Sequence, residues 1–293
     1  MLVTGGNTGI GLETVVGLAR TGARVVFTAR DPARGQRARA EVVERTGNGT
    51  VELMHLDLAS FASIRAFARA FLAAHDRLDV LVANAGIAPA GHRWETVDGL
   101  EAAFGVNHLG HFLLTDLLLD RLVASAPARV VIVSSNAHQV ATDGLCFHDL
   151  QHEQEFHSMQ VYGESKLANI YFARELARRL GGTGVTVNAL NPGYVATRLG
   201  QVRPEDEAVA EQIPQGPPTR AVKRLVGVLP PPMSPSDGAR TSLLLALDPA
   251  LGAVSGAYYS EGHPEALGPI ASDDVAARRL WQLSEALVAE RPG

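Results

Sequence analysis

A tyrosine and a lysine four residues apart are the pair in this sequence best suited to acid–base chemistry. They are Tyr162 and Lys166, in a chain with five tyrosines and only two lysines among its 26 lysines and arginines. Residues i and i+4 of a helix lie on one face, so the lysine ammonium would lie beside the phenol. A nearby cation favours the phenolate and lowers a pKa that is ordinarily ~10. We therefore expect Tyr162 to exchange a proton with a substrate, although the pair alone would also fit an ordinary solvated helix face.

A glycine-rich turn close to the N-terminus is typical of a dinucleotide-binding site. Gly5, Gly9 and Gly11 follow a short apolar start, and a helical pattern runs from there towards Gly22. Glycines let a pyrophosphate approach the backbone, and the unpaired N–H groups and dipole of a helix N-terminus favour an anion. The spacing Gly-x3-Gly-x-Gly is a variant of the usual fingerprint, so the turn predicts a bound dinucleotide.

Apolar strand segments alternate with helical patterns along the rest of the chain. We expect strands at residues 24–27, 51–56, 78–83, 129–134 and 185–190, and helices at 31–47, 60–75, 100–125 and 159–180. Nearly continuous apolar strands between helices predict a parallel sheet covered on both faces, with its ligand at the carboxyl ends of the strands. Since no linker divides the middle of the chain, residues 1–293 are predicted to form one α/β domain.

Composition argues against several classes of protein. The net charge of −5 argues against nucleic acid as a main partner, and hydrophobic residues at 46% supply a large core. Cys146 is the only cysteine, which excludes an intrachain disulfide and a zinc site built from several cysteines. His148, His152 and His157 fall in one predicted loop, where we expect surface histidines rather than a metal site.

The sequence also bears on the cellular compartment. No apolar run reaches the ~18 residues of a membrane helix, because Asp116, Asp120 and Arg121 interrupt the richest stretch. No secretory signal opens the chain. We therefore expect a cytoplasmic protein without a membrane span. Because the glycine turn begins so soon, we also expect the native chain to extend upstream of Met1.

Six short motifs occur in order along almost the whole chain. They lie at residues 4–11, 106–112, 133–138, 161–169, 191–197 and 255–260, and the first and fourth read TGGNTGIG and VYGESKLAN. Together they resemble the short-chain dehydrogenase/reductase family, above all its retinol dehydrogenase and protochlorophyllide reductase-like branch. The resemblance implies a single-domain Rossmann fold, a doubly wound parallel sheet of about seven strands with helices on both faces, and NAD(P)-dependent hydride transfer.

The resemblance also implies roles for residues in the catalytic motifs. Ser135 would hydrogen-bond the substrate oxygen, with Ser134 as its competitor, since strand alternation points the two in opposite directions. Tyr162 would pass its proton to a carbonyl oxygen or take one from an alcohol. Lys166 would lower the pKa of this tyrosine and hold the ribose of the nicotinamide nucleotide. Asn107 would support a water relay to the lysine, or would be a polar residue packed beside the sheet.

Contacts with the cofactor are implied by the same motifs. Besides Tyr162 and Lys166, the expected residues are Gly5, Asn7, Thr8, Gly9, Ile10, Gly11, Arg30, Asp57, Leu58, Asn84, Ala85, Gly86, Pro192, Gly193, Val195 and Thr197. Asp57 would contact the adenine or cap a strand end. Ala83 stands where the family more commonly has an asparagine. The backbone contact with the cofactor is still expected through the residues that follow it.

The choice between the two nicotinamide cofactors follows from charge at the end of the second strand. NAD-selective folds carry an acid there for the ribose hydroxyls, whereas this chain has Ala29 followed by Arg30. A guanidinium suits a phosphate through paired hydrogen bonds, so we expect NADP(H), with help from Arg34 and with NAD(H) as the alternative. Asp31 is the rival acid, but it also fits a helix cap.

Substrate and partners are less constrained by the sequence. The proline-rich segment 199–236 occupies the substrate-loop position, and its apolar stretch 225–229 would line a hydrophobic pocket or pack as a helix or lid. We expect reversible carbonyl/alcohol interconversion on a small hydrophobic molecule. The alternatives are reduction of a carbon–carbon double bond and a non-catalytic NADP(H)-sensing protein. Relatives often pair through the two long helices, here 102–123 and 159–180, which predicts a homodimer.

Overall fold

The computed structural model describes residues 1–89, 91–195 and 232–291. Its strands are β1 (Leu2–Val3), β2 (Val25–Ala29), β3 (Val51–His55), β4 (Val80–Ala83), β5 (Ala128–Val133), β6 (Val185–Asn191), β7 (Tyr258–Ser260) and β8 (His263–Pro264). Its main helices are α1 (Gly9–Ala19), α2 (Pro32–Thr46), α3 (Phe61–Ala74), α4 (Ala102–Phe104), α5 (Gly110–Ala124), α6 (Ser158–Arg179), α9 (Pro235–Leu247) and α10 (Asp274–Ala289). Short helical turns are η1 (Gly105–Leu109), η2 (Asn136–Val140) and η4 (Pro249–Leu251).

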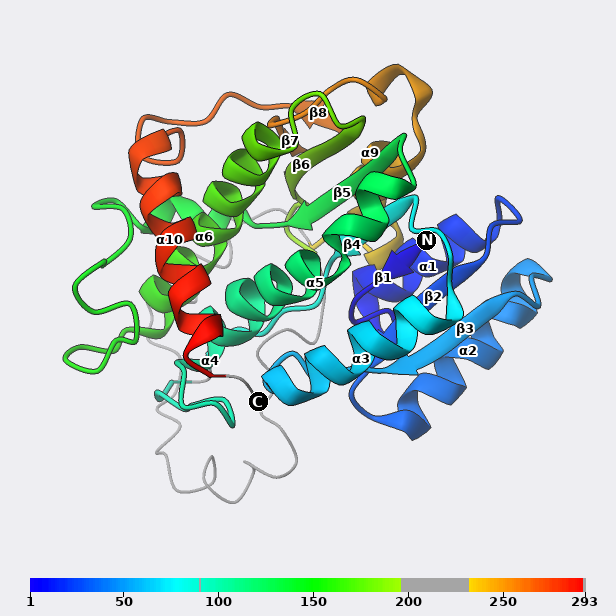
Figure 1. Cartoon of the computed structure of the whole chain (residues 1–293), viewed down its shortest axis with the longest axis horizontal. Helices are drawn as coiled ribbons and strands as arrows, with labels where there is room; N and C mark the ends of the chain where they lie inside the picture. Colours follow the sequence, from blue (N-terminus) through cyan, green and yellow to red (C-terminus); the bar gives the residue numbers. More distant parts are fainter. Residues whose placement is uncertain (90, 196–231, 292–293) are drawn as a thin grey trace.

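The strands form one twisted sheet in the order β3-β2-β1-β4-β5-β6-β7-β8 (Figure 1). All neighbours are parallel except β7 and β8, which are antiparallel. The predicted doubly wound α/β fold is therefore confirmed. The count of about seven strands omitted β8, a two-residue strand too short to leave a sequence pattern. The order reverses between β1 and β4, where folds of this kind place their ligand.

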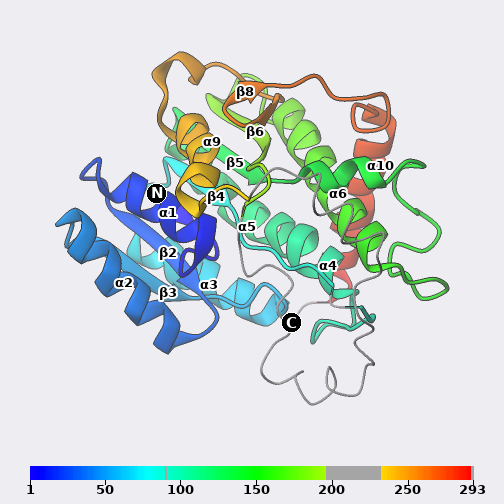
Figure 2. The same cartoon turned by 180° about the vertical axis from the view of Figure 1, so that it is seen from behind.

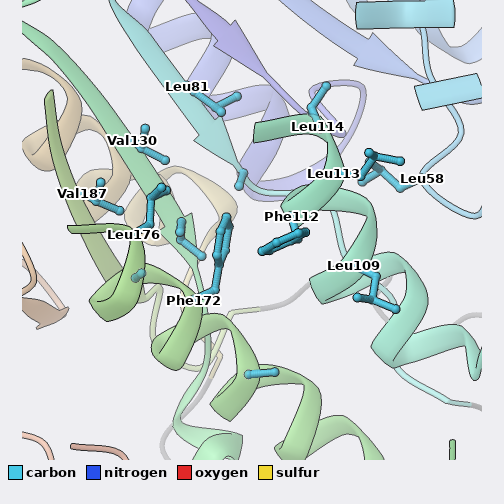
Figure 3. Close-up of a cluster of buried hydrophobic side chains, with 14 of the residues drawn as sticks. Leu58, Leu81, Leu109, Phe112, Leu113, Leu114, Val130, Phe172, Leu176 and Val187 are labelled. Atoms are coloured by element: carbon cyan, nitrogen blue, oxygen red, sulfur yellow. The ribbon is translucent and has the colours of Figure 1, made fainter. Parts of the chain in front are cut away.

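Helices cover both faces of the sheet. The helices α3, α5 and α6 lie on one face (Figure 1), and α1, α2 and α9 lie on the other (Figure 2). Figure 3 shows the larger core, in which Phe112 of α5 and Phe172 of α6 pack beside the strand residues Leu81, Val130 and Val187. Each fully buried side chain of this size contributes ~1.5–3 kcal/mol, so this layer holds the two helices firmly on the sheet.

Local signals fix the starts of α2 and α3 as the sequence predicted. Asp31 accepts hydrogen bonds from the backbone N–H groups of Ala33 at 2.8 Å and Arg34 at 3.0 Å, and Pro32 opens the helix. Ser60 caps α3 by accepting from the N–H of Ser63. Side-chain caps of this kind are worth about 1 kcal/mol each, which explains why both helix starts were readable from residue type.

The long helix predicted at residues 100–125 is interrupted. A π-helical turn, η1, separates α4 from α5, and the N–H of Gly110 bonds the carbonyl of Gly105 five residues back. At Gly110 the chain passes so close to the loop between β3 and α3 that an added Cβ would lie 2.8 Å from the carbonyl oxygen of Leu58. Isolated π turns are common at functional sites because they redirect backbone groups. This one holds Asn107 at its centre.

The C-terminal helix α10 packs against α5 and α6 (Figure 1). The ring of Trp281 lies 4.9 Å from that of Phe112 and 6.0 Å from that of Phe172, measured between centroids. His108 and Ser284 share a buried hydrogen bond of 2.8 Å. The predicted homodimer would use the same two helices, α5 and α6, and remains a prediction.

Two further expectations meet the structure outside the core. The prediction of surface histidines is wrong for His152, which is only 8% exposed. It lies in the loop before α6 and pairs with Glu164 of that helix at 3.4 Å. The segment 199–231, including the apolar stretch 225–229, lies outside the described residues, and α9 begins at Pro235, within the expected substrate loop. No helix within 1–89, 91–195 and 232–291 has the length and hydropathy of a membrane span.

Candidate active site

The predicted site residues gather at the carboxyl edge of the sheet, around the point where the strand order reverses. The glycine turn follows β1, the loop of Asn84, Ala85 and Gly86 follows β4, and Ser135 comes two residues after the end of β5. The helix α6 returns past the same edge and brings Tyr162 and Lys166. Parallel strands therefore deliver residues far apart in sequence to one place.

The glycine turn has the geometry of an anion cradle. Gly5 adopts a φ of +65°, and a Cβ on Gly11 would lie 2.3 Å from the carbonyl oxygen of Gly5 and 2.5 Å from Nδ2 of Asn84. No side chain caps the first turn of α1, because the N-cap residue Thr8 makes no capping hydrogen bond. The N–H groups at the start of the helix thus remain available to a pyrophosphate, which fits the dinucleotide that the turn predicts.

The loop after β4 is tied to the glycine turn by hydrogen bonds. Nδ2 of Asn84 donates to the carbonyl of Thr4 at 2.8 Å. The hydroxyl of Thr4 accepts from the N–H groups of Asn84 at 2.9 Å and Ala85 at 3.0 Å. Asn84 therefore supports the backbone of the turn with its side chain, and Ala85 contributes through its backbone.

Thr4 also begins a buried network that we call the scaffold cluster, made of Thr4, Asn107, His111 and Ser165. Nδ1 of His111 lies 3.0 Å from the carbonyl oxygen of Asn107, which can only accept, so this nitrogen carries the proton. Nε2 must then accept the hydroxyl proton of Thr4 at 2.8 Å. Burial lowers the pKa of His111 to about 4, so the ring is neutral and its tautomer is fixed by these two neighbours.

Asn107 uses its side chain to join two segments. Its Nδ2 donates to the carbonyl of Ile87 and to the hydroxyl of Ser165, both at 2.9 Å, and its Oδ1 accepts from the N–H of Ile87 at 2.8 Å. The Ser165 hydroxyl in turn donates to the carbonyl of Tyr162 at 2.8 Å. The side chain is thus packed and bonded beside the sheet, as one of the two interpretations held, and a water relay remains a prediction.

Ser135, Tyr162 and Lys166 form a second group, which we call the tyrosine cluster. The Ser135 side chain lies near enough to the phenol of Tyr162 to act on its pKa. Nζ of Lys166 lies 5.6 Å from the centre of the Tyr162 ring, and its one protein partner among the described residues is the carbonyl of Val133 at 3.4 Å. A Cβ on Gly86 would lie 3.3 Å from this Nζ. The glycine therefore leaves the ammonium open towards the loop after β4.

The pKa values in the tyrosine cluster depart from the sequence prediction. Burial raises the pKa of Tyr162 to about 12, with the Ser135 side chain acting in the opposite direction. Burial also lowers the pKa of Lys166 to about 8. The expectation of a phenol made acidic by its neighbour is thus wrong for the chain alone. Desolvation disfavours both the phenolate and the ammonium, and the ammonium faces the ring rather than bonding the phenolic oxygen.

Adjacent serines at the end of β5 have different partners. Ser134 is buried, and its hydroxyl donates to the carbonyl of Lys166 at 2.7 Å, which ties the strand to α6. Ser135 caps η2, accepting from the N–H of Ala137 at 3.1 Å, and meets the phenol. Strand alternation therefore separates the two hydroxyls as expected, and it directs Ser135 towards the tyrosine.

Residues expected near the adenosine end lie on exposed turns. Arg30 follows β2 and is exposed, and Asp31 is engaged as the cap of α2. One oxygen of Asp57 accepts from the N–H of Ala59 at 2.9 Å, which confirms its turn-forming role; its adenine contact remains a prediction. The side chain of Leu58 lies in the core (Figure 3), so it can meet a cofactor only through its backbone.

The segment after β6 borders the glycine turn. Gly193 has a φ of +88°, and a Cβ there would lie 2.8 Å from the sulfur of Met233. Val195 pairs with Met233 in a single β-bridge, and both Val195 and Ile10 approach Gly238 at the start of α9. Pro192 immediately precedes this turn. The expected contact Thr197 lies outside the described residues.

Sequence reasoning gave no role to Thr4, His111 or Ser165, which together hold the turn, the π-helical segment and α6. A signal was present for His111, since it stands four residues after Asn107 and so shares its helix face. Nothing in the sequence announced the π turn that lets the Asn107 carbonyl meet this ring.

The chain is similar to known proteins over most of its length. The family model described as enoyl-(acyl carrier protein) reductase matches residues 5–226. Retinol dehydrogenase 14 of Mus musculus is 42% identical over 305 residues, covering 98% of this chain and 85% of that protein. Retinol dehydrogenase 12 of Mus musculus is 44% identical over 286 residues, covering 97% and 84%.

Solved structures share the architecture as well. An uncharacterised protein from Mycobacterium paratuberculosis is 34% identical, with a TM-score of 0.73 over 98% of this chain and 92% of that one. A Pseudomonas aeruginosa RhlG/NADP active-site complex is 28% identical, with a TM-score of 0.66 over 88% and 93%. With the sheet order and the glycine turn, these likenesses place the chain in the short-chain dehydrogenase/reductase family as a retinol dehydrogenase-like, NAD(P)-dependent oxidoreductase.

Proposed function

We propose that this chain interconverts a carbonyl and an alcohol on a small hydrophobic substrate, with NADP(H) as the preferred cofactor. The observation that carries the proposal is the tyrosine cluster, in which the Tyr162 phenol lies beside Ser135 and has the Lys166 ammonium against its ring. These groups stand at the carboxyl edge of the sheet, beside the loop after β4 and the uncapped start of α1.

Each group has one task in the proposed reaction. The cofactor, when bound, supplies a hydride to the carbonyl carbon in reduction or accepts one in oxidation. Tyr162 gives its phenolic proton to the carbonyl oxygen as the alcohol forms, and takes that proton back in the reverse direction. The Ser135 hydroxyl hydrogen-bonds the same oxygen while charge develops on it. Lys166 stabilises the phenolate that Tyr162 leaves behind and has two further protons for ribose hydroxyls.

The direction of the reaction should depend on pH through Tyr162. Because burial raises the pKa of the phenol to about 12, the protonated form that reduction needs dominates at neutral pH. Oxidation needs the phenolate, so its rate should rise with pH more steeply than the rate of reduction. A bound cofactor with a positively charged nicotinamide ring would favour the phenolate and lower this pKa.

The preference for NADP(H) rests on charge at the end of β2. Ala29 ends the strand without an acid, Arg30 follows on an exposed turn, and Asp31 is engaged by the backbone of α2. A 2′-phosphate would therefore meet a guanidinium rather than a free carboxylate. Arg30→Ala is expected to raise the Kd for NADPH at least tenfold more than that for NADH, and an equal effect on both would refute this preference.

The central test is turnover of a panel of hydrophobic ketones and aldehydes, followed by loss of NADPH absorbance, with NADH alongside. Tyr162→Phe should reduce kcat by about a thousandfold while NADPH still binds, because only the proton donor is removed. Tyr171→Phe is the matched control, since this tyrosine lies on the same helix and its hydroxyl donates to the carbonyl of Ile270 instead. Turnover retained by Tyr162→Phe would remove the phenol from the mechanism.

A second reaction deserves its own assay because the matching family model is described by an enoyl reductase. The same phenol would then protonate carbon after hydride addition to a conjugated double bond. Product analysis with an α,β-unsaturated ketone separates the two, since carbonyl reduction gives an allylic alcohol and double-bond reduction gives the saturated ketone. Absence of NADPH consumption with every carbonyl compound and enone would favour the third hypothesis, a non-catalytic NADP(H)-sensing protein.

The predicted homodimer through the long helices is weighed against the position of α10. Trp281 already packs against the rings of Phe112 and Phe172, and burying an aromatic side chain is worth about 2–3 kcal/mol. Sedimentation of the chain and of Trp281→Ala distinguishes the cases. A monomer that pairs only after the substitution would mean that α10 takes the place of a partner on this face.

A further inference from the structure

A cavity of about 310 Å³ opens beside η2. We call it the η2 cavity. Its walls come from the end of η2, the middle of α6 and the segment that follows β8, and they include His138, Ala141, Leu167, Glu265, Leu267 and Ile270. Neither Ser135, Tyr162 nor Lys166 lines it. Its volume is at the lower end of the ~300–1,000 Å³ of sites that bind small molecules.

The helix α6 packs closely on η2 beside this cavity. A Cβ on Gly163 would be 2.6 Å from the carbonyl oxygen of Ala137 and 3.2 Å from Cβ of Val140. Because no residue of the tyrosine cluster lines the η2 cavity, an occupant there would be distinct from a substrate at Tyr162.

His138 gives the cavity a polar point with a defined character. The residue is only 7% exposed, and its Nδ1 lies 2.7 Å from the carbonyl oxygen of Ser135. Because a carbonyl can only accept, Nδ1 carries the proton, and Nε2 of the neutral ring must be an acceptor. Nε2 has no partner among the residues that the structure describes. A nearly buried ring thus presents an unused lone pair at the wall of an otherwise mainly apolar cavity.

The other polar groups nearby favour the same kind of ligand. Glu265 adds a second acceptor to the wall. Tyr258 packs edge-on against the His138 ring at 5.4 Å, and its hydroxyl is buried without a partner among the described residues. A hydroxyl group both donates and accepts, so a ligand alcohol can donate to Nε2 and keep its lone pairs for other groups. A molecule without a donor would leave the acceptors unpaired.

We propose that the η2 cavity is a second small-molecule site, which binds an apolar molecule through one hydroxyl group donated to Nε2 of His138. The site is independent of the proposed reaction. It is nevertheless coupled to the catalytic edge, because both the ring and the backbone N–H of His138 bond the carbonyl of Ser135, at 2.7 and 3.1 Å. An occupant that moves His138 moves the residue whose hydroxyl meets Tyr162.

The probe is 2-phenyl-2-propanol, a tertiary alcohol with no hydrogen on its carbinol carbon, so hydride transfer cannot oxidise it. Its methyl ether has nearly the same shape and no donor. Calorimetric titration of the full chain without cofactor should give one site for the alcohol and roughly fivefold weaker binding of the ether, the effect of one hydrogen bond of ordinary strength. Equal affinities for the two would overturn the proposal.

Two variants and a control locate the site. His138→Phe keeps a ring and removes the acceptor, so the alcohol should bind no better than the ether. Ile270→Trp fills the cavity from its exposed rim and should weaken both probes at least tenfold without touching His138. His148→Phe makes the same chemical change at an exposed histidine outside the cavity and should bind as the native chain does.

Circular dichroism of each variant separates loss of the site from loss of the fold, and Ile270→Trp decides the matter if His138→Phe fails to fold. A preference for the alcohol that survives both variants would place the probe elsewhere and refute the proposal. Inhibition kinetics with the alcohol complete the test. The alcohol should change kcat for a carbonyl substrate without raising its KM, whereas purely competitive inhibition would mean that it sits in the catalytic cleft.

Discussion

The scaffold cluster is fully buried, whereas the tyrosine cluster combines the buried Lys166 with the half-buried Ser135 and Tyr162. The two clusters adjoin at Ser165 and Lys166, but their polar groups differ in how many hydrogen-bond partners they have. In the scaffold cluster the hydroxyl of Thr4 and both ring nitrogens of His111 have protein partners. In the tyrosine cluster the three protons of the Lys166 ammonium meet a single carbonyl, at 3.4 Å, within the part of the chain that the structure describes.

This difference distinguishes residues that support the fold from residues that can act on a ligand. A buried polar group costs free energy unless it is bonded, so a saturated network such as that of His111 holds one geometry and stabilises it. A buried ammonium with unbonded protons lowers the stability of the fold, and those protons are available to a ligand. The pKa values express that cost, since burial shifts the pKa of Lys166 to about 8 and that of Tyr162 to about 12.

The strongest test of this comparison is Lys166→Met, which should separate activity from stability. Turnover should fall about a thousandfold, because the phenolate loses its cation. At pH 7 the free energy of unfolding should instead rise, by up to about 3 kcal/mol, since the folded chain no longer holds a buried ammonium whose pKa lies below its ordinary value of 10.5. Chemical denaturation and NADPH consumption measure the two effects.

The pH dependence fixes the sign of this effect. Between pH 8 and 10.5 the unfolded lysine still binds its proton and the folded one does not, so the native chain gains stability as pH rises. The advantage of Lys166→Met should therefore be complete below pH 8 and vanish near pH 10.5. A variant that is less stable than the native chain at pH 7 would show that the ammonium is satisfied within the fold.

The two serines after β5 provide the next test. Ser135→Ala should lower kcat by about a hundredfold or more with little change in stability, because its hydroxyl acts on the substrate oxygen. Ser134→Ala should leave kcat nearly unchanged and lower the free energy of unfolding by about 1–3 kcal/mol, since the carbonyl of Lys166 loses a buried partner. Similar kinetic effects of the two substitutions would contradict the assignment of a catalytic role to Ser135 and a structural role to Ser134.

In the scaffold cluster the expected effect is on folding. His111→Leu removes the acceptor of the Thr4 hydroxyl proton and the ring donor to the Asn107 carbonyl, which should lower the free energy of unfolding by about 2–3 kcal/mol. Thr115→Val is the matched control one turn further along α5, because the Thr115 hydroxyl is buried with no partner among the described residues. Urea titrations should show no loss for the control. Equal losses at both positions would mean that the two hydrogen bonds of the His111 ring do not explain its contribution to stability.

The sequence was sufficient for those features that depend on residue type and spacing. The cap at Asp31, the glycine turn and the face shared by Tyr162 and Lys166 all follow from local rules, and parallel strands necessarily bring their carboxyl ends to one edge. For the same reason the predicted cofactor and catalytic residues within the described chain lie around a single edge, apart from the core side chain of Leu58.

The features that escaped prediction depend on tertiary packing. The π turn at Asn107 accompanies the close approach of Gly110 to Leu58, which no periodicity encodes. The raised pKa of Tyr162 reflects how much protein surrounds the phenol, whereas sequence spacing reports only its neighbour on the helix. The position of α10 across α5 and α6 is likewise a long-range contact, although Trp281 stands in an amphipathic helix that had to pack somewhere.

The smallest change in the free energy of unfolding is expected at Tyr258, whose unpaired hydroxyl lies away from the catalytic edge. Burial, with a contribution from Glu265, raises the pKa of this tyrosine, and its hydroxyl has no partner among the described residues. Tyr258→Phe keeps the edge-on contact with His138, so the free energy of unfolding should stay the same or rise by up to about 1 kcal/mol. A loss of more than 1 kcal/mol in a urea titration would reveal a bonding partner such as an internal water.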